Sequence, residues 1–529
     1  MRIGIPRGLL YYHYFPMWKT FFEYLGCEVV VSPRTNEEIL SSGCSSVIGD
    51  ICLPVKVYCG HVRSLQNSCD YLFIPSVHSM QEKVYNCPKF IGLPDIVRAS
   101  IPKCPPILDP DVDVNKGPKV ISQTVETFSR VFTQDSHQAR KAVGKALKAH
   151  HEYARQMELH NLRPPHGIGR MFPELHEEPD SDGAKAALTI AVIGHRYVLH
   201  DPHISYRLVQ RLHELGAKAV FAEAVDESVL RESMKELVDQ KYWGFEEEII
   251  GAGAYYMRSN VDGIIAMECF GCGPDSLMVH LIQRGARRFN KPFLNLVLDE
   301  HSAEGGLVTR IEAFIDMVKR AKSRPSTKAV VPRLIGEEQD GIKALGLPNM
   351  GVIGPAFRGP AKLLDVRLII PPITKRTIAL GTRNSPEFAC LPFKVILGSF
   401  IECLEDGADT LFMVTSSNAC RMGYYSKVQE QILRDMGYKF AFLRHRSSDR
   451  GLLGVLRTIR RCTNRAPWSR VIKAYRIGTA KLKALDDLDR KASRDRAVEL
   501  EKGQIERIRH SAVRGIEEAE TIPELKRVL

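Results

Sequence analysis

A repeat within the chain constrains its fold more than any other feature of the sequence. When residues 33–60 are aligned with residues 371–398 without a gap, eight of the 28 positions are identical. The identical residues of the first copy are Pro33, Gly43, Cys52, Leu53, Pro54, Lys56, Val57 and Gly60. After one inserted residue, Asp70-Tyr71-Leu72-Phe73 meets Asp409-Thr410-Leu411-Phe412. Both copies read strand, helix, CLPxKV, helix, strand, so the first and third parts of the chain are predicted to share one fold.

Short apolar runs bounded by Gly or Pro predict buried parallel strands, separated by segments of helical length. In the first copy these are residues 2–5, 28–32 and 71–74. A middle part, which is predicted to hold three such strands, contains LTIAVIGHRY from Leu188, AKAVFAEAV, residues 263–267 and KPFLNLVLDEH. The third part begins with MGVIGPAF at Met350, followed by RLIIPP, TLFMVTSS and KFAFLRH. The predicted fold class is α/β, with several doubly wound, Rossmann-like units.

Composition shifts suggest where these units begin and end. A long connecting helix is predicted after Pro118, with Phe128 and Met157 on its apolar stripe. A polar loop at 177–183 indicates a domain boundary. The predicted division is an α/β unit at 1–118, a helical connector and loop at 119–186, α/β units at 187–325 and 349–450, and a basic helical tail at 451–529.

The charge of the chain is concentrated in that tail. The whole chain has 74 basic and 62 acidic residues, a net charge of +12. Residues 451–529 have 19 Lys and Arg against 11 Asp and Glu, so 19 − 11 = +8 lies there. Because the acidic residues are interspersed and no zinc-finger or basic-zipper pattern is present, we expect the tail to pack on the body or dock an acidic partner rather than bind nucleic acid.

Several function classes are excluded by missing patterns. No run approaches the roughly 18 apolar residues of a membrane-spanning helix, and the N-terminal segment has no small-residue cleavage site, which predicts a cytoplasmic protein without membrane contact. The sequence also has no GxxxxGK loop, no kinase motif and no GxGxxG between a strand and a helix. We therefore expect no intrinsic ATPase activity, and energy must come from another protein.

The 13 cysteines are expected to be core residues or metal ligands, because cytosolic thiols stay reduced. Cys52 and Cys390 are copies of each other in the repeat. Cys87 and Cys420 follow Phe73 and Phe412 by 14 and 8 residues, in loops at the carboxyl ends of strands, where open α/β sheets bind ligands. These four are predicted metal ligands. Seven others are predicted core residues: Cys27, Cys44, Cys59, Cys69, Cys104, Cys403 and Cys462.

The middle unit contributes FGCGPDS, in which Cys272 follows a strand and precedes a helix. Gly271 and Gly273 allow backbone amides to approach an anion closely, such as a thiolate-ligated iron–sulfur cluster. Cys269 and Cys272 also form a CxxC, which could be a redox pair or half of a zinc site. No second CxxC completes a zinc ribbon.

Two further groups of charged residues are candidates. Lys56 and Lys394 lie four residues past their cysteines, so each could balance cluster charge or meet a ligand phosphate, or could be an ordinary solvated lysine. The segment DEHSAEGG follows another strand, and its Glu300, His301 and Glu304 suit proton transfer. Helix capping is the alternative for this segment.

Several of these stretches resemble a known family. IGIPRGLLYYHYFPMWKTFFEYLGCEVVVSP, ICLPVKVYCGHV, NCPKFIGLPD, FGCGPDS and LDEHSAEGGLVTRIEAF are similar to the uncharacterised family associated with activases of 2-hydroxyacyl-CoA dehydratases, over residues 1 to about 325. CLPFKVILGSF and NACRMGYYSKVQEQILRDMGY resemble a sister family that usually follows it.

The resemblance implies an oxygen-sensitive iron–sulfur protein of the dehydratase and double-cubane class. It implies reduction by a separate actin-like ATPase, the activase, which carries its own [4Fe-4S] cluster. The positions that match the three cluster cysteines of that class are Cys52, Cys87 and Cys272. Cys390 and Cys420 match part of a second site, so one cluster, two clusters or a double cubane are all compatible with the resemblance.

Two hypotheses of different classes follow. In the first, the chain is an electron-transfer or reductase component that passes low-potential electrons to a small acceptor such as an acyl-CoA thioester. In the second, it is a non-catalytic scaffold or activase partner, with structural metal or no metal. Iron and sulfide analysis after anaerobic purification separates them.

Overall fold

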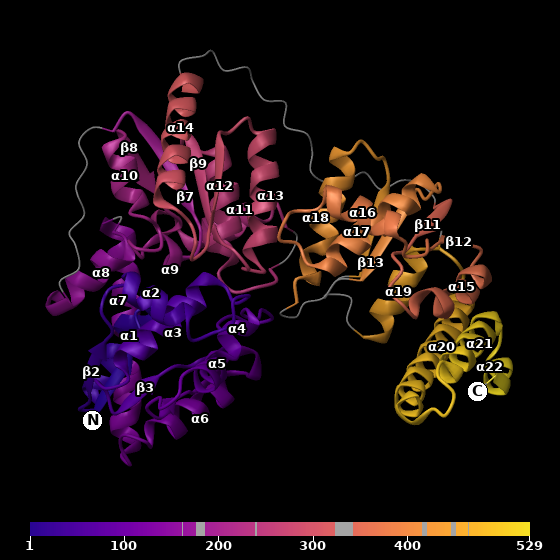
Figure 1. Ribbon diagram of the computed structural model, residues 1–529, viewed down its shortest axis with the longest axis horizontal. Coiled ribbons are helices and arrows are strands. Elements are labelled where there is room, and N and C mark those ends of the chain that lie inside the picture. The colour runs from indigo at the N-terminus through magenta and orange to yellow at the C-terminus, as the bar shows by residue number, and fades with distance from the viewer. Residues whose placement is uncertain are drawn as a thin grey trace. The chain divides into compact units, whose positions relative to one another are not determined.

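The computed structural model describes residues 1–160, 162–175, 186–238, 241–322, 342–414, 420–445, 451–463 and 465–528. The predicted polar loop at 177–183 lies outside the described residues. The chain divides into two compact units, Met1–Leu334 and Ile335–Leu529 (Figure 1). Every strand pair in the sheets is parallel, which confirms the predicted α/β class.

The first sheet has the strand order β2-β1-β3-β5. Its strands are β1 Arg2–Ile5, β2 Glu28–Val31, β3 Tyr71–Phe73 and β5 Ile107–Leu108. The helices that join its strands include α1 Tyr11–Tyr24, α2 Glu37–Cys44, α3 Leu53–Leu65, α4 Pro88–Ile91 and α5 Leu93–Ser100. A small second pair, β4 Ser76–Ser79 with β6 Asp111–Asp113, extends the region beyond β3. The three strands predicted here are confirmed.

A second sheet lies in the same unit, with the order β10-β9-β7-β8. Its strands are β7 Leu188–Ile193, β8 Ala217–Val220, β9 Gly263–Cys269 and β10 Phe293–Leu298. Three strands were predicted here, whereas all four apolar runs of this part form strands. The helices around it are α9 Arg196–Leu199, α10 Leu208–Glu214, α11 Glu227–Met234, α12 Ala252–Arg258, α13 Asp275–Arg288 and α14 Glu304–Lys322. All seven residues of β9 are buried, as expected of a central strand covered on both faces.

The connector between these sheets differs from the prediction of one long helix. It consists of α6 Pro118–Ser129, α7 Ser136–His160 and α8 Pro164–Met171. The break before α7 has a local cause, because the backbone N–H of His137 donates to the Asp135 carboxylate at 2.7 Å and starts a new helix. Helix α7 packs along α1, and the hydroxyl of its Tyr153 donates to the Tyr12 carbonyl oxygen at 2.7 Å.

The third sheet belongs to the second unit and repeats the strand arrangement of the first. Its order is β12-β11-β13-β14, with β11 Ala344–Gly346, β12 Arg367–Ile369, β13 Thr410–Val414 and β14 Ala441–His445. Helices α16 Lys375–Asn384 and α17 Leu391–Glu405 correspond to α2 and α3. Cys52 and Cys390 are the N-cap residues of α3 and α17. The predicted repeat therefore corresponds to a repeated structure.

The prediction of a strand at MGVIGPAF is wrong. The first strand of this sheet is the three-residue β11, which lies before Met350, and residues from Ile353 to Leu363 form helix α15. Pro355 lies in the first turn of α15, where the missing backbone N–H costs nothing. An apolar run this short does not separate a strand from a helix by periodicity alone.

Backbone contact between two helices explains the repeated glycines. A Cβ atom on Gly60 would lie 1.9 Å from the carbonyl oxygen of Ile39, and one on Gly398 would lie 1.9 Å from that of Thr377. Gly43 and Gly381 are confined in the same way by the carbonyl oxygens of the two motif lysines. Helices α2 and α3, like α16 and α17, thus cross with no room for a side chain at the contact.

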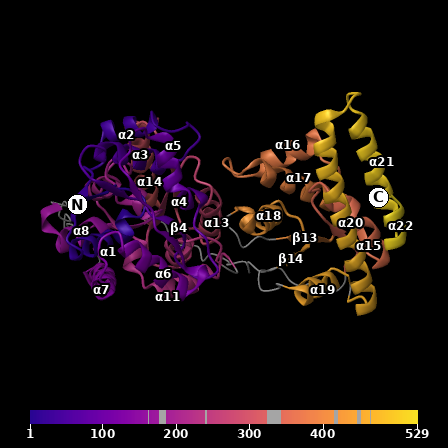
Figure 2. The same ribbon diagram turned by 90° about the horizontal axis from the view of Figure 1, so that it is seen from below.

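The basic tail is helical, as predicted, and packs within the second unit (Figure 2). It forms α19 Leu452–Arg461, α20 Trp468–Asp495, α21 Gln504–Glu518 and α22 Ile522–Val528. Helices α20 and α21 pack on α15, around a core that includes Ala356, Leu485 and Ile516. The buried Lys481 ammonium donates to the Glu517 carbonyl oxygen at 2.8 Å. Among the described residues, no helix is both long and apolar enough to cross a membrane.

Candidate metal centre

Three of the predicted metal ligands meet in one pocket of the first unit. Cys52, Cys87 and Cys272 all line it, although they come from three separate segments of the chain. Cys52 and Cys87 are the residues immediately before α3 and α4, and Cys272 lies in the turn between β9 and α13. The pocket thus brings together residues from the loops that follow strands of both sheets of this unit. The predicted convergence of these cysteines is present in the structure, while their role as metal ligands stays a prediction.

Local backbone features hold the cysteines in place. Pro54 and Pro88 lie in the first turns of α3 and α4, which fixes where each helix begins after its cysteine. Gly271 has a φ of 74°, a conformation that favours glycine, and the next residue, Cys272, donates its backbone N–H to the Cys269 carbonyl oxygen at 2.9 Å. Gly273 lines the pocket beside Cys272. Gly271 therefore shapes the turn, and the predicted role of both glycines near a bound group stays a prediction.

The pocket walls are largely apolar and aromatic. They include Phe90, Tyr197, Trp243 and Phe245. Burial raises the pKa of the Cys87 thiol, and burial together with the nearby Asp275 carboxylate raises the pKa of Cys272 well above its usual value. The raised pKa values favour the protonated form of the Cys87 and Cys272 thiols, so a metal that binds these two sulfurs must displace their protons.

Residues that the sequence reasoning missed add nitrogen and oxygen atoms to the three thiols. Nε2 of His195 lies 3.0 Å from Oδ1 of Asp275. A ring nitrogen of His195, the sulfur of Cys272 and a carboxylate oxygen of Asp275 all lie within 4.8 Å of one another. Asn86, immediately before Cys87, also lines the pocket.

Two residues that line this pocket, Asn86 and His195, have a buried polar atom without a hydrogen-bond partner, as do several residues elsewhere in the chain. Among the described residues, Oδ1 of Asn86 and Nδ1 of His195 are buried without a hydrogen-bond partner, whereas Oδ1 of Asp275 makes only the ion-pair contact with Nε2 of His195. Such atoms are rare in folded proteins, since each costs free energy to bury unpaired. Their presence beside three thiols fits a site that binds a metal group.

Glu268 is a second residue that the sequence reasoning missed. It lies in β9, it is buried, and Asn295 Nδ2 donates to its Oε1 at 2.5 Å. Burial raises its pKa to about 7, and the Asp275 carboxylate adds to this effect. Glu268 does not line the cysteine pocket, but a buried carboxyl group with a pKa near neutral is a candidate proton carrier.

Sequence signals for these residues existed. His195 directly follows the strand run LTIAVIG, at the carboxyl edge where Cys272 was placed by the same reasoning. Asp275 belongs to FGCGPDS itself. Glu268 is the one charged residue in the apolar run of β9.

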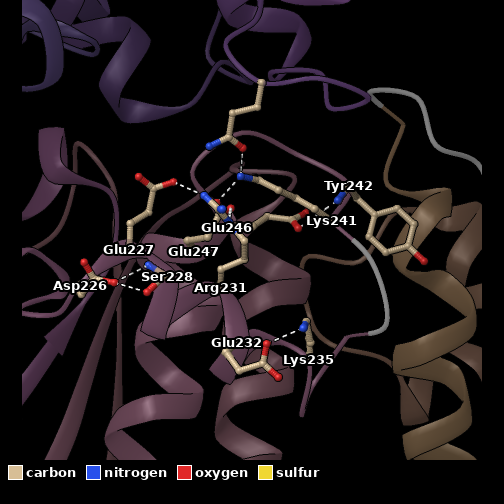
Figure 3. Close-up of polar contacts among 11 residues, drawn as sticks. Asp226, Glu227, Ser228, Arg231, Glu232, Lys235, Lys241, Tyr242, Glu246 and Glu247 are labelled. Atoms are coloured by element: carbon tan, nitrogen blue, oxygen red, sulfur yellow. Dashed lines mark hydrogen bonds and ion pairs between the residues drawn. The ribbon is translucent and has the colours of Figure 1, made fainter.

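The segment 241–247, which supplies Trp243 and Phe245, is tied to the loop that carries Cys87. The Gly244 backbone N–H donates to the Tyr85 carbonyl oxygen at 3.1 Å. Lys241 contacts both Gln81 and Glu247 (Figure 3). Within the segment, the buried Glu246 carboxylate accepts the backbone N–H groups of Tyr242 and Trp243 at 3.0 and 2.7 Å. The aromatic wall and the Cys87 loop are therefore joined by direct hydrogen bonds.

Lys56 and Glu300 form a pair, although the sequence analysis assigned them separate roles. The Lys56 ammonium forms an ion pair with Glu300 and donates to the Gly49 carbonyl oxygen at 2.7 Å. Lys56 is buried, and its charge holds the pKa of Glu300 below the ordinary value although burial acts in the opposite direction. Neither residue lines the cysteine pocket. In the other copy, Lys394 donates to the Glu387 carbonyl oxygen at 3.2 Å, which is the equivalent contact.

The remaining residues of DEHSAEGG lie apart from the pocket. His301 is 85% exposed, and Glu304, the first residue of α14, forms an ion pair with Arg211. The Asp299 carboxylate accepts the His301 backbone N–H at 3.0 Å, which closes a turn before the helix. Glu300, His301 and Glu304 therefore do not meet at the thiols, and their proposed part in proton transfer stays a prediction.

The cysteines of the second unit have different neighbours. Cys390 is half-buried and contacts the hydroxyl of Tyr425, and Cys420 is exposed. Burial raises the pKa of Tyr425, and both cysteines add to this effect, so the two thiols lie near one tyrosine. Their role as ligands of a second cluster stays a prediction. Cys269 is buried in β9 and does not line the pocket of the first unit.

Most of the seven cysteines predicted to be core residues are buried. Cys27, Cys59, Cys69, Cys403 and Cys462 are buried, and Cys44 and Cys104 are half-buried.

The N-terminal part of the chain, which supplies some of the pocket residues, is similar to a known family. Residues 2–225 match the model of the CoA enzyme activase uncharacterised domain. This confirms the resemblance to an activase-related family over those residues. The activase-related domain contains Cys52, Cys87 and His195, whereas Cys272 and the aromatic wall at 243–245 follow it in the chain. The comparison with curated proteins gave no match.

Proposed function

We propose that the cysteine pocket holds a [4Fe-4S] cluster and that the chain is an electron-transfer or reductase component of a CoA-enzyme system. The observation that carries this proposal is the convergence of Cys52, Cys87 and Cys272 in one apolar pocket with unpaired polar atoms. Thiolates are the usual ligands of iron–sulfur clusters, and such a cluster supplies one-electron transfer at low potential. The aromatic walls would limit the access of water to it.

The source of electrons in this proposal is a separate ATP-dependent activase of the actin-like class. The chain has no recognisable phosphate-binding loop, and its first 225 residues match a domain described by its relation to CoA enzyme activases. Each transfer would oxidise the activase by one electron and reduce an acceptor by one electron. An acyl-CoA thioester or another small molecule is the proposed acceptor. Charge balance near the cysteines by Lys56 and Lys394 stays a prediction, because Lys56 pairs with Glu300 and does not line the pocket.

A second function is favoured by one specific observation. Three thiols with a histidine nearby are also a ligand set of structural zinc sites. A zinc-bound pocket would make the chain a scaffold or an activase partner that carries no electrons.

Metal analysis after anaerobic purification tests the proposal. About four irons and four sulfides per chain are expected for one [4Fe-4S] cluster, whereas zinc, or no metal, would support the scaffold. Cys272→Ser should lose most of the iron and the charge-transfer absorption. Cys269→Ser is the matched control, because Cys269 is the other thiol of the same CxxC, and it should keep both. The opposite behaviour of the two variants would contradict the assignment of Cys272.

A further inference from the structure

We propose that His195 is the fourth protein ligand of the metal group held by Cys52, Cys87 and Cys272, through its Nδ1 atom. This inference rests on the proposed function, because it concerns the same pocket. It makes the site a Cys₃His site with no iron left open.

The position of His195 is fixed by its surroundings. The residue follows β7, is the N-cap of α9 and is 5% exposed. Its ring stacks on Tyr197, with 4.8 Å between ring centroids and 14° between planes. Phe245 packs edge-on against the ring at 6.5 Å. All three residues line the pocket with the cysteines, so the imidazole is held there in one orientation.

The two ring nitrogens of His195 are in different situations. Nε2 lies 3.0 Å from the Asp275 carboxylate, while Nδ1 is buried and has no hydrogen-bond partner among the described residues. Histidines that bind metals usually direct one nitrogen at a carboxylate or carbonyl group, which sets the tautomer and leaves the lone pair of the other nitrogen for the metal. His195 and Asp275 have this arrangement in a pocket that contains three thiols.

The other unpaired oxygens are weaker candidates for the fourth position. Asp275 already faces the His195 ring, and Asn86 is held through its Nδ2, which donates to the Val77 carbonyl oxygen at 3.3 Å. Carboxylate and amide oxygens suit hard cations such as Mg²⁺, whereas imidazole suits iron. We therefore assign the ligand role to His195 and the role of positioning it to Asp275.

Four protein ligands have a consequence for function. Without an open iron, the group can exchange electrons but has no free position for an acceptor molecule. Replacing thiolate by imidazole also raises the reduction potential, as in iron–sulfur centres where histidines replace cysteines. The structure in this way favours an electron carrier over a centre that binds its substrate.

Nitrogen spectroscopy on the full chain tests this inference. Protein that carries ¹⁵N-labelled histidine would be purified and reduced anaerobically, and the reduced cluster would be measured by pulsed EPR. We expect a ¹⁵N coupling typical of directly bound imidazole, which is lost in His195→Gln. The matched control is His137→Gln, which changes an exposed histidine at the start of α7 and should leave the coupling unchanged.

A second variant covers the case in which His195→Gln does not load iron. His195→Cys should keep the iron content of the wild type and lower the midpoint potential, since a thiolate replaces the imidazole. Circular dichroism of each variant checks that the fold is intact. If both folded variants fail to load iron, the inference is overturned.

The results separate this inference from the function on which it rests. An iron-loaded wild type without histidine coupling, or with a coupling that persists in His195→Gln, overturns the fourth-ligand assignment and leaves the iron–sulfur proposal intact. A wild type without iron overturns both.

Discussion

Cys52 and Cys390 occupy the same position in two copies of one scaffold, but they have different neighbours. In both copies the cysteine precedes a helix whose glycine touches the backbone of the previous helix, and the lysine four residues later donates to a carbonyl oxygen seven residues before it. In the first unit the cysteine lines a pocket with two more thiols. In the second unit it contacts Tyr425.

The difference between the copies comes from segments outside the repeat. The first unit contains a second sheet, and the residues that follow its strands supply Cys272, His195 and the partner Glu300 for Lys56. The second unit has helices α19 to α22 instead, which pack on α15. Duplication therefore reproduces the cysteine and its helix, while the neighbouring segments determine what that cysteine can bind.

The largest expected difference between the two copies is the loss of iron when the cysteine of each copy is replaced. Cys52→Ser should remove most of the iron from the anaerobic protein, because the pocket loses one of three thiols. Cys390→Ser should have a much smaller effect on iron content. Equal losses from the two variants would show that both copies hold metal, and full retention in Cys52→Ser would end the three-cysteine assignment.

The glycines that pack the helices should behave alike in the two copies. Gly60→Ala and Gly398→Ala each place a Cβ 1.9 Å from a carbonyl oxygen, so the helices must move apart. We expect a loss of about 4 kcal/mol of stability in each case. The measurement is urea denaturation followed by circular dichroism. Gly144→Ala in α7 is the control, since nothing lies near its added Cβ, and it should not destabilise the protein.

The two lysines should differ in stability. Lys56→Met leaves Glu300 without its cation at a site where the lysine is 3% exposed, and we expect a loss of about 3 kcal/mol. Lys394→Met removes a hydrogen bond to a carbonyl oxygen from a less buried position, and should cost about 1 kcal/mol or less. Similar losses in denaturant midpoint would contradict the view that Glu300 distinguishes the first copy.

A smaller effect is the pH dependence of stability that Glu268 is expected to cause in the first unit. The pKa of Glu268 is raised to about 7 from an ordinary value of 4.5, so its carboxyl group binds a proton more tightly in the folded state. Its contribution to stability is fully present below pH 4.5 and is lost as pH rises through about 7. Between pH 5 and 8 the wild type should lose about 2 kcal/mol relative to Glu268→Gln. A difference that does not change with pH would show that Glu268 is ionised throughout.

The sequence allowed the sheets to be predicted for physical reasons, and the set of three thiols was implied by the family resemblance. The apolar runs that form β1, β7 and β9 were long enough to be recognised as strands. The sequence repeat predicted that the third sheet has the same arrangement as the first. Cys87 and Cys272 could each be assigned to the carboxyl edge of its own sheet, where open α/β sheets bind ligands, and the family resemblance implied that the two meet at one site.

Other features depend on contacts between distant residues and left no local pattern. Lys56 and Glu300 are 244 residues apart, and the sequence gave them separate roles because nothing in either segment indicates the other. The pairing of His195 with Asp275 depends on how α13 and the end of β7 lie in space. The strand at Met350 was predicted wrongly because β11 has only three residues.

The long sequence separation of the pocket residues also has a consequence for biosynthesis. Translation proceeds at about 5–20 residues per second, so a ribosome needs on the order of ten to forty seconds to extend the chain from Cys87 to Cys272. During that interval the first two thiols have neither Cys272 nor the aromatic wall at 243–245 beside them. The site of the proposed metal group is therefore complete only after the middle sheet has emerged, so the proposal places metal loading late in the maturation of the protein.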